Sequence, residues 1–254
     1  MNEHRLHYIP LESDPIIFTE LIQALGVHSL QFHDVLSLDL ADLSPSGALA
    51  LPADPYALIL IFPTTQEYEA DLKAAKKRAH LDGTQYKGCG EQEPVHWFEQ
   101  TIGNACGLYA ILHAVANLGP AASKDHIASG SVLESFLAEV IPFDPEQRAA
   151  ALETSPAIAE AHRRAAVQGS TPVPDAEDEV YFHYICFVKS PKNGHIYELD
   201  GDKNGFVDRD SFLEGDQDLL SGGLKLVQSL IETESQQFQL MALVPTTSPP
   251  TELP

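Results

Sequence analysis

A cysteine set among small residues is the feature of this sequence with the clearest chemical potential. In the stretch QTIGNACGL (residues 100–108), the Cys106 thiol falls where an apolar helical pattern begins. The first turn of a helix presents free N–H groups and a partial positive charge, which favour the reactive thiolate. Gly103, Ala105 and Gly107 are small enough for a substrate backbone to approach. We interpret Cys106 as a nucleophile, although by itself it is equally well interpreted as a small buried hydrophobic residue.

A histidine and an aspartate on a predicted hairpin supply the base that a cysteine nucleophile needs. His183 interrupts the strand pattern VYFHYICFVK (180–189), and Asp200 ends the returning strand HIYELD (195–200) after an Asn-Gly turn signal. Because their separation is odd, a two- or four-residue loop places Asp200 opposite Ile185 or Phe187. The first register makes His183 and Asp200 diagonal neighbours. A buried carboxylate there needs a donor such as the imidazole. The alternative role of His183 is a satisfied core histidine.

Gln100 completes the candidate set, because acyl transfer builds an oxyanion that two N–H donors can hold. The Gln100 side-chain amide and the Cys106 backbone N–H are the candidate donors. Gln100 alone is weak evidence, since a surface glutamine is common. Two other histidines fit the role of base less well: His195 is expected to be exposed near the turn, and His113 lies two turns along the Cys106 helix. Together, Gln100, Cys106, His183 and Asp200 indicate a papain-like cysteine hydrolase.

Composition excludes several other classes of function. The chain has 15 basic and 37 acidic residues, for a formal net charge of −22. This balance argues against binding to nucleic acid or to an anionic membrane surface. Three cysteines without a zinc-ligand spacing predict free thiols, no metal site and no cofactor. The N-terminus has no apolar signal core, so we predict a cytoplasmic protein that can also be nuclear.

The secondary-structure pattern predicts an α+β fold, with a mostly antiparallel central sheet flanked by helices, in one domain over residues 1–244. A Pro/Thr-rich tail follows at 245–254. The apolar periodicity and capping residues predict helices at 15–25, 65–80, 104–118, 131–140 and 219–231. Alternating or continuous apolar runs predict strands at 30–38, 56–62, 180–189, 195–200 and 238–244, with a short extended piece at 95–98.

Residues 142–179 differ from the rest of the chain. This stretch contains five prolines and many alanines but few bulky apolar residues. Its alanine-rich part, 145–167, has helix propensity but little to bury. A segment this long between core elements is usually functional or disordered. We therefore expect this segment to be functional or disordered.

The motifs resemble those of the ubiquitin C-terminal hydrolase family of cysteine peptidases. The likeness runs from residue 8 to residue 244 and includes YIPLESDP, LILIFPTTQEYE, QTIGNACGL, IASGSVLESFL, FHYICFV and YELDG. The resemblance implies that Cys106 is the nucleophile, His183 the general base and acid, Asp200 its orienter and Gln100 the oxyanion donor. It also implies a knotted backbone, a monomer, and an active-site crossover loop at about 142–179. With it we expect substrate contacts from Pro10, Leu11, Glu12, Asn104 and Tyr184.

The expected activity is removal of small or unfolded adducts from the C-terminal glycine of ubiquitin or a ubiquitin-like protein. An acidic enzyme would then be steered toward a basic ubiquitin face. The alternative is a protein that holds mono-ubiquitin with little turnover. The resemblance outside the four site residues argues against other papain-like reactions, such as transglutamination. The chain departs from the family after YELDG, where basic residues and a proline are usual and this sequence reads DKNGF (202–206).

Overall fold

A six-stranded antiparallel sheet organises the chain. The computed structural model describes residues 5–170, 174–176, 181–213, 218–233 and 237–246. The strand order in the sheet is β1-β6-β2-β3-β4-β5, and every pairing is antiparallel. The strands are β1 (Leu30–Asp34), β2 (Ala57–Pro63), β3 (Phe182–Lys189), β4 (Ile196–Leu199), β5 (Val207–Asp208) and β6 (Gln239–Pro245). The predicted α+β fold with a central antiparallel sheet is confirmed.

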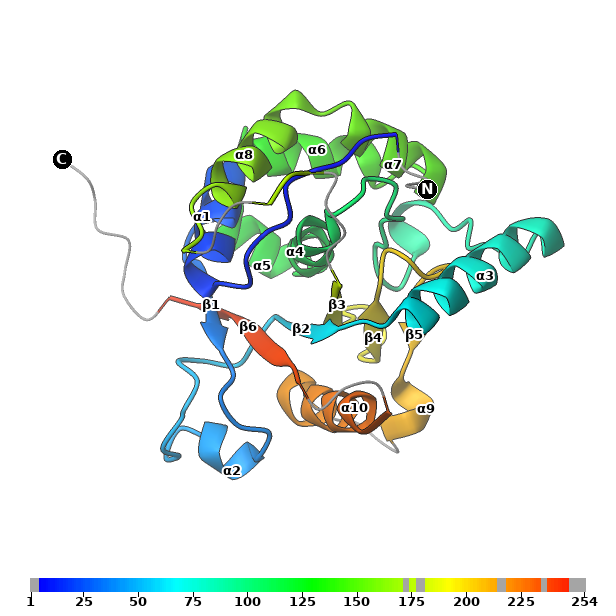
Figure 1. Ribbon diagram of the computed structural model, residues 1–254. Helices are drawn as coiled ribbons and strands as arrows, with labels where there is room; N and C mark the ends of the chain where they lie inside the picture. Colours follow the sequence, from blue (N-terminus) through cyan, green and yellow to red (C-terminus); the bar gives the residue numbers. More distant parts are fainter. Residues whose placement is uncertain (1–4, 171–173, 177–180, 214–217, 234–236, 247–254) are drawn as a thin grey trace.

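Strand β2 is buried on both faces and separates two apolar cores, as its continuous apolar run predicted. Ala57, Ile59 and Ile61 pack into the core that contains α1 and α4. The alternate residues, including Leu58 and Leu60, pack into a second core with α10 (Leu219–Thr233). Figure 1 shows the corresponding layers, with α1 and α4 to α8 over one face of the sheet and α9 and α10 over the other.

The helices begin and end largely where the capping signals predicted. Helix α1 (Pro15–Leu25) is capped by the Asp14 side chain and ends at Gly26, whose φ of 103° is left-handed. The Thr65 and Ser131 side chains cap α3 (Gln66–Asp82) and α6 (Val132–Val140). Helix α4 (Cys106–Ala116) starts at Cys106, and most of its residues are buried. The remaining short helices are α2 (Leu40–Leu43), α5 (Pro120–His126) and α9 (Asp210–Leu213), with a 3₁₀ turn at Gly90–Gln92.

Two expectations require correction. The strand predicted over 30–38 ends at Asp34, while residues 95–98 belong to no helix or strand. The loop predicted over 142–179 is wrong for most of its described length, because α7 (Pro145–Glu153) and α8 (Pro156–Ala166) occupy 145–166. Their prolines stand in the first turn, where a missing N–H costs nothing, and Asp144 and Ser155 cap them. Small alanines allow α8 to pack closely against α1, with Ile158 fully buried.

The β3–β4 hairpin has the register that the odd spacing allowed. A four-residue loop follows Ser190, whose N–H donates to the His195 carbonyl at 2.8 Å. Cys186 pairs with Leu199, so one further step in the register places Asp200 opposite Ile185. This is the register that makes His183 and Asp200 diagonal neighbours.

Among the described residues, no helix is both long and apolar enough to cross a membrane.

Candidate active site

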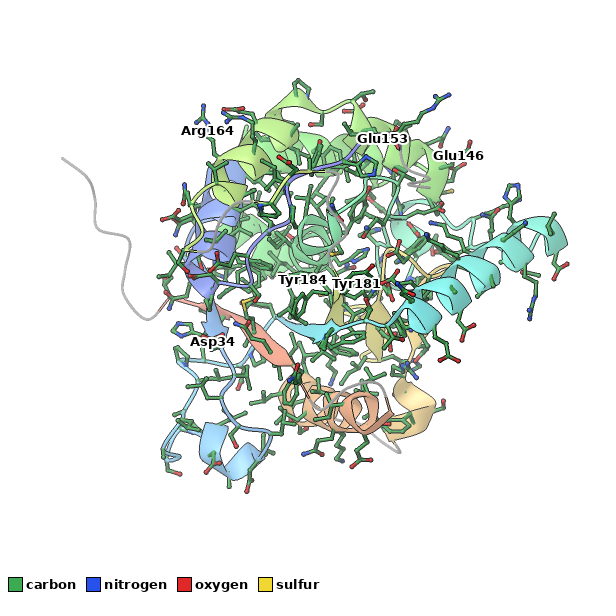
Figure 2. The ribbon with its side chains drawn as sticks, in the orientation of Figure 1. Asp34, Glu146, Glu153, Arg164, Tyr181 and Tyr184 are labelled. Carbon is green, nitrogen blue, oxygen red and sulfur yellow. The ribbon has the colours of Figure 1, made fainter. Side chains whose placement is uncertain are left out.

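One cavity gathers nearly all of the predicted site residues. It has a volume of about 800 Å³, and one wall is formed by the N-terminal segment and the start of β3. Helix α3 and the residues that follow β4 also line it. Figure 2 shows Tyr181 and Tyr184 near the centre of the molecule, whereas Arg164 lies at its periphery. Predicted site residues that line the cavity are Pro10, Leu11, Glu12, Gln100, Asn104, Cys106, His183 and Tyr184. Asp200 is the exception, since it lies behind His183.

Cys106 is the first residue of α4 and opens onto the cavity. The residue before it, Ala105, has non-helical dihedral angles, and its side chain makes no capping hydrogen bond. The first N–H groups of α4 are therefore not capped by Ala105. The Cys106 thiol is partly exposed, and its Sγ lies 3.9 Å from the Phe182 carbonyl oxygen, next to His183 in sequence. The nucleophile candidate therefore meets both the positive end of a helix and the start of the histidine strand.

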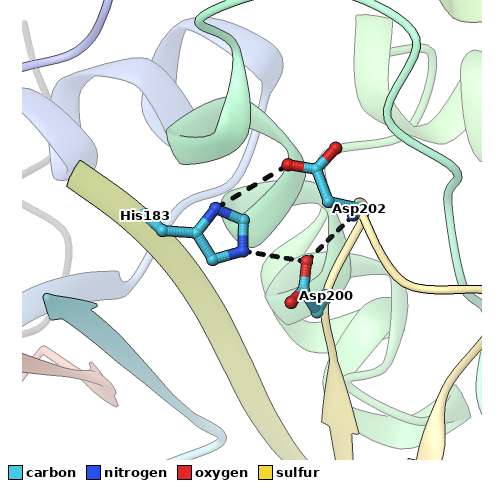
Figure 3. A group of neighbouring side chains, drawn as sticks. All are labelled: His183, Asp200 and Asp202. Atoms are coloured by element: carbon cyan, nitrogen blue, oxygen red, sulfur yellow. Dashed lines mark hydrogen bonds and ion pairs between the residues drawn. The ribbon is translucent and has the colours of Figure 1, made fainter. Parts of the chain in front are cut away.

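His183 and Asp200 form a buried pair. The Nε2 of His183 lies 2.9 Å from Asp200 Oδ1, and Asp200 is only 1% exposed. Figure 3 shows the Asp200 and Asp202 carboxylates next to each other beside the imidazole, each facing a different ring nitrogen. Two donors hold Asp200 in place: the Trp97 indole N–H donates to its carbonyl oxygen at 2.8 Å, and the Asp202 backbone N–H donates to Oδ1 at 2.9 Å. The carboxylate is thus preset to orient the ring.

The electrostatic environment favours a protonated imidazole. Burial lowers the pKa of His183, but the Asp200 charge and hydrogen bond, the Cys106 side chain and Asp202 outweigh it, so the net pKa is well above its usual value. Burial raises the pKa of Asp200, but the same imidazole and Lys203 bring it below the ordinary range. An imidazolium beside a thiol can stabilise a thiolate and can later deliver a proton to a leaving group.

Gln100 is attached directly to the loop that follows Asp200. Gln100 is 5% exposed, and its backbone N–H donates to the Gly201 carbonyl oxygen at 2.8 Å. Its backbone carbonyl oxygen accepts a hydrogen bond from Lys76 Nζ at 3.3 Å. A Cβ at Gly201 would lie 2.8 Å from the Gln100 Cβ, so the two segments can approach this closely only because residue 201 is glycine. The Gln100 carboxamide and the His183–Asp200 pair are therefore anchored at one junction.

The expected substrate contacts already contact other parts of the chain. The Tyr184 hydroxyl donates to the Leu11 carbonyl oxygen at 2.9 Å, and Glu12 accepts a bond from Ser170 Oγ at 2.9 Å. Asn104 has a left-handed φ of 58°, and its side-chain amide donates to the Ala176 carbonyl at 2.8 Å. These contacts tie the N-terminal segment and the cysteine loop to the described parts of the segment after α8.

The glycines flanking Cys106 line the cavity and also lie close to the chain's own N-terminal segment. A Cβ at Gly103 would lie 2.3 Å from the His7 ring, and one at Gly107 would lie 3.3 Å from Leu11. The backbone of residue 103 also bonds to the N-terminal segment, with Tyr8 N–H donating to its carbonyl at 3.0 Å. These small residues make room for the chain's own N-terminal segment, and the approach of a substrate backbone stays a prediction.

Other residues contribute to the site without a clear local signal. Trp97 anchors Asp200, and the fully buried His113 accepts the Phe98 N–H at 3.0 Å through Nε2. Burial lowers the pKa of His113 to about 4 despite the nearby Asp200 charge, so it serves as a neutral acceptor. His195 lies at the surface beside Asp208, as predicted. Of the additional residues near the site, only Asp202 was marked by the sequence, because it directly follows YELDG, where the chain departs from the family pattern.

A metal ion is the alternative occupant to consider here. His183, Asp200 and Asp202 present ligand atoms within 4.8 Å of one another, a spacing that could hold an ion. However, the 2.9 Å hydrogen bond between His183 and Asp200 joins the imidazole directly to a carboxylate, which is the pairing that orients a general base. With a thiol at a helix start facing the same imidazole, the arrangement is that of a cysteine hydrolase.

Comparison with known proteins identifies the family. Residues 8–232 match the family described as "Ubiquitin carboxyl-terminal hydrolase, family 1". The chain is 33% identical over 235 residues to ubiquitin carboxyl-terminal hydrolase isozyme L1 of Monodelphis domestica, covering 92% of this chain and 96% of that protein. It is 31% identical over 247 residues to a probable ubiquitin carboxyl-terminal hydrolase of Dictyostelium discoideum, covering 95% and 89%. The chain belongs to the ubiquitin carboxyl-terminal hydrolase family of cysteine peptidases.

Solved structures agree on the fold. The crystal structure of the Trichinella spiralis UCH37 catalytic domain, bound to ubiquitin vinyl methyl ester, superposes with a TM-score of 0.65 at 23% identity. The match covers 94% of this chain and 96% of that one. A longer UCH37 chain of the same organism, also bound to ubiquitin vinyl methyl ester, gives a TM-score of 0.64 at 22% identity.

Proposed function

We propose that this chain hydrolyses small or unfolded adducts from the C-terminal glycine of ubiquitin or a ubiquitin-like protein. One observation carries the proposal: Cys106, His183 and Gln100 line one cavity, while Asp200 is hydrogen-bonded behind the imidazole. Support for ubiquitin as partner comes from the family and from the ubiquitin-derived ligand of the similar UCH37 structures. The net charge of −22 adds long-range steering toward a basic partner, which predicts that catalytic efficiency falls as ionic strength rises.

The proposed reaction proceeds through a thioester. The Cys106 thiolate, paired with the His183 imidazolium, attacks the carbonyl carbon of the C-terminal glycine of ubiquitin. The Gln100 side-chain amide and the Cys106 backbone N–H stabilise the oxyanion. Imidazolium then protonates the leaving amine as the C–N bond breaks, which leaves a thioester on Cys106. Neutral His183 next takes a proton from water as the hydroxide attacks the thioester carbonyl. The C–S bond then breaks, the ubiquitin carboxylate and a proton are released, and the thiolate–imidazolium pair is restored.

The preference for small adducts rests on the segment after α8. Among the described residues of 167–181, Gly169, Pro174 and Tyr181 line the cavity. Part of this stretch, 171–173 and 177–180, lies outside the described residues. Bonds from Ser170 to Glu12 and from Asn104 to Ala176 hold its described ends against the cavity rim. We assign the crossover role to 167–181, a shorter segment than the 142–179 expected from sequence. The knotted backbone path implied by the family resemblance belongs to the same proposal.

Hydrolysis of a fluorogenic ubiquitin C-terminal amide tests the assignment. The unmodified chain should turn over this substrate and ignore a general peptide, and Cys106→Ala should abolish turnover while ubiquitin binding persists. Ubiquitin carrying a short peptide adduct should be cleaved faster than ubiquitin carrying a folded protein. Tight binding of mono-ubiquitin without turnover by the unmodified chain would favour the alternative of a ubiquitin-holding protein. Hydrolysis that survives Cys106→Ala contradicts the role given to the thiol.

A further inference from the structure

A second carboxylate, that of Asp202, faces the ring nitrogen of His183 that Asp200 does not bond. Asp202 Oδ2 lies 3.8 Å from His183 Nδ1, while Nε2 is taken by Asp200 at 2.9 Å (Figure 3). Nδ1 is therefore the ring nitrogen that remains for the Cys106 sulfur. A distance of 3.8 Å is an ion-pair distance rather than a hydrogen bond. Asp202 thus adds its charge to this nitrogen without taking the hydrogen that the sulfur needs.

Asp202 is built into the site. Its side chain is 25% exposed and lines the cavity together with Cys106 and Gln100. Its backbone N–H donates to Asp200 Oδ1 at 2.9 Å, so the positions of the two carboxylates are coupled. The loop is further held where Lys203 pairs with the buried Glu198 of β4. The backbone that carries the Asp202 carboxylate is consequently held beside the imidazole.

Several charged or titratable groups surround His183 and Asp202, and their effects on the pKa values of these two residues oppose one another. Burial raises the pKa of Asp202, and the Asp200 and Glu69 charges add to that rise, whereas His183 and Lys76 oppose it. Lys203 favours the charged form of Asp200. Asp202 acts on His183 directly. The groups facing the pair are Asp200 beside the ring, Cys106 from α4, Tyr68, Glu69 and Lys76 from α3, and Lys203 after β4.

We propose that Asp202 is a positioning residue for the catalytic imidazole, which keeps His183 protonated and directed at the cavity into the alkaline range. The inference rests on the proposed function, because it takes His183 as the general acid. A nearby anion makes loss of the imidazolium proton harder, so removing it lowers the pH at which that proton is lost. An opposite charge at this distance shifts a pKa by about 1–3 units, and partial exposure of Asp202 favours the lower end, about one unit.

The first test is the pH profile of kcat/KM on the fluorogenic ubiquitin amide. In Asp202→Asn, the alkaline limb should move about one pH unit toward acid, so that activity on that limb falls about tenfold. A purely structural role would lower activity at all pH values alike. Asp82→Asn, which removes one negative charge at the exposed end of α3, should leave the limb in place. An unmoved alkaline limb in Asp202→Asn overturns the inference.

The second test needs no ubiquitin. Alkylation of Cys106 by iodoacetamide, followed by peptide mass spectrometry from pH 5 to 10, reports the ionisation of the thiol–imidazole pair. The exposed Cys89 in the same protein serves as reference. The alkaline step of the Cys106 profile should move toward acid in Asp202→Asn while the Cys89 profile stays unchanged. Asp202→Ser provides a second variant, with thermal unfolding to confirm that each is folded.

The two tests separate two kinds of failure. If the unmodified chain does not cleave the ubiquitin amide but the Cys106 alkylation profile still shifts in Asp202→Asn, the proposed function fails and the role of Asp202 stands. If cleavage is normal and neither profile shifts, the role of Asp202 fails and the proposed function stands.

Discussion

Replacing Arg148 with methionine should destabilise the protein more than most single substitutions. Arg148 lies on α7 and is fully buried. Both of its terminal nitrogens bond to the Glu93 carboxylate. Its remaining donors reach the carbonyl oxygens of Val140 at 3.1 Å, Ile141 at 2.9 Å and Trp97 at 3.1 Å. Methionine fills similar space but satisfies none of these acceptors.

The expected magnitude follows from the group left behind. Glu93 is 4% exposed, so Arg148→Met leaves a buried carboxylate without its cation, an effect that typically costs about 3–5 kcal/mol. Burial raises the pKa of Glu93, but His96 and Arg148 bring it below its ordinary value, so the carboxylate is charged at neutral pH. For a chain of this size, about 2–4 °C per kcal/mol predicts a fall in Tm of about 6–20 °C.

A double-mutant cycle by urea unfolding distinguishes a coupled pair from independent contacts. Arg148→Met, Glu93→Gln and the double variant would be compared with the unmodified protein at one temperature. The double variant should be more stable than the sum of the single effects predicts, by about 1–3 kcal/mol, because neither charge is then left alone. Strict additivity, or a cost below about 1 kcal/mol for Arg148→Met, would refute the reasoning.

The same substitution should also impair catalysis. Arg148 bonds the Trp97 carbonyl, and the Trp97 indole bonds the Asp200 carbonyl. Loosening Trp97 therefore loosens the carboxylate that orients His183, so kcat should fall more than KM rises in steady-state assays at a temperature where the variant is folded. An unchanged kcat in a folded Arg148→Met variant would show that the Trp97 contact does not depend on the guanidinium.

Further predictions concern the oxyanion donor, acid stability and the crossover segment. Gln100→Ala should lower kcat about 10²–10³-fold with little change in KM or Tm, as measured with the fluorogenic amide; a loss confined to KM would contradict the oxyanion role. Burial lowers the pKa of both His113 and His162 to about 4. The unfolded chain binds more protons than the folded one between about 4 and 6.5, so stability should fall as pH drops through that range, by about 3 kcal/mol per histidine. Urea unfolding at pH 7 and pH 4.5 checks this fall, and His162→Gln should flatten it. Asn104→Gly keeps the left-handed backbone but removes the bond to Ala176, so it should increase cleavage of bulky adducts relative to small ones. An unchanged ratio of the two cleavage rates would argue against the crossover role given to 167–181.

Local signals were sufficient where a feature depends on neighbouring residues. Asp14 before a proline and Gly26 after the apolar stripe mark the two ends of α1. The odd separation of His183 and Asp200, combined with a short loop, restricts the hairpin register to two options, one of which the structure has. The apolar helix pattern places Cys106 in a first turn, and α4 begins there. Each of these predictions rests on dihedral preferences or side-chain periodicity over a few residues.

Features that depend on distant partners could not be predicted in this way. Alanine-rich α7 and α8 lack the bulky apolar stripe that signals a buried helix, yet they bury Leu152, Ile158 and small residues. Arg148 would ordinarily be assigned to a surface, and only the presence of Glu93, distant in sequence, makes its burial favourable. His162 is similar, since its partner is the Ile9 carbonyl at 2.8 Å.

The junction between Gln100 and Gly201 shows why the site depends on contacts that no single motif contains. The two catalytic halves are far apart in sequence, and they meet through a backbone hydrogen bond of 2.8 Å. That approach requires the absence of a Cβ at residue 201, which lies directly after Asp200. The glycine of the Asp-Gly pair is thus explained by the proximity of Gln100 rather than by its own turn. Since Trp97 also reaches Asp200 from the Gln100 side, the carboxamide and carboxylate are positioned by the same two segments. A substitution that separates these segments should therefore weaken oxyanion binding and imidazole orientation together.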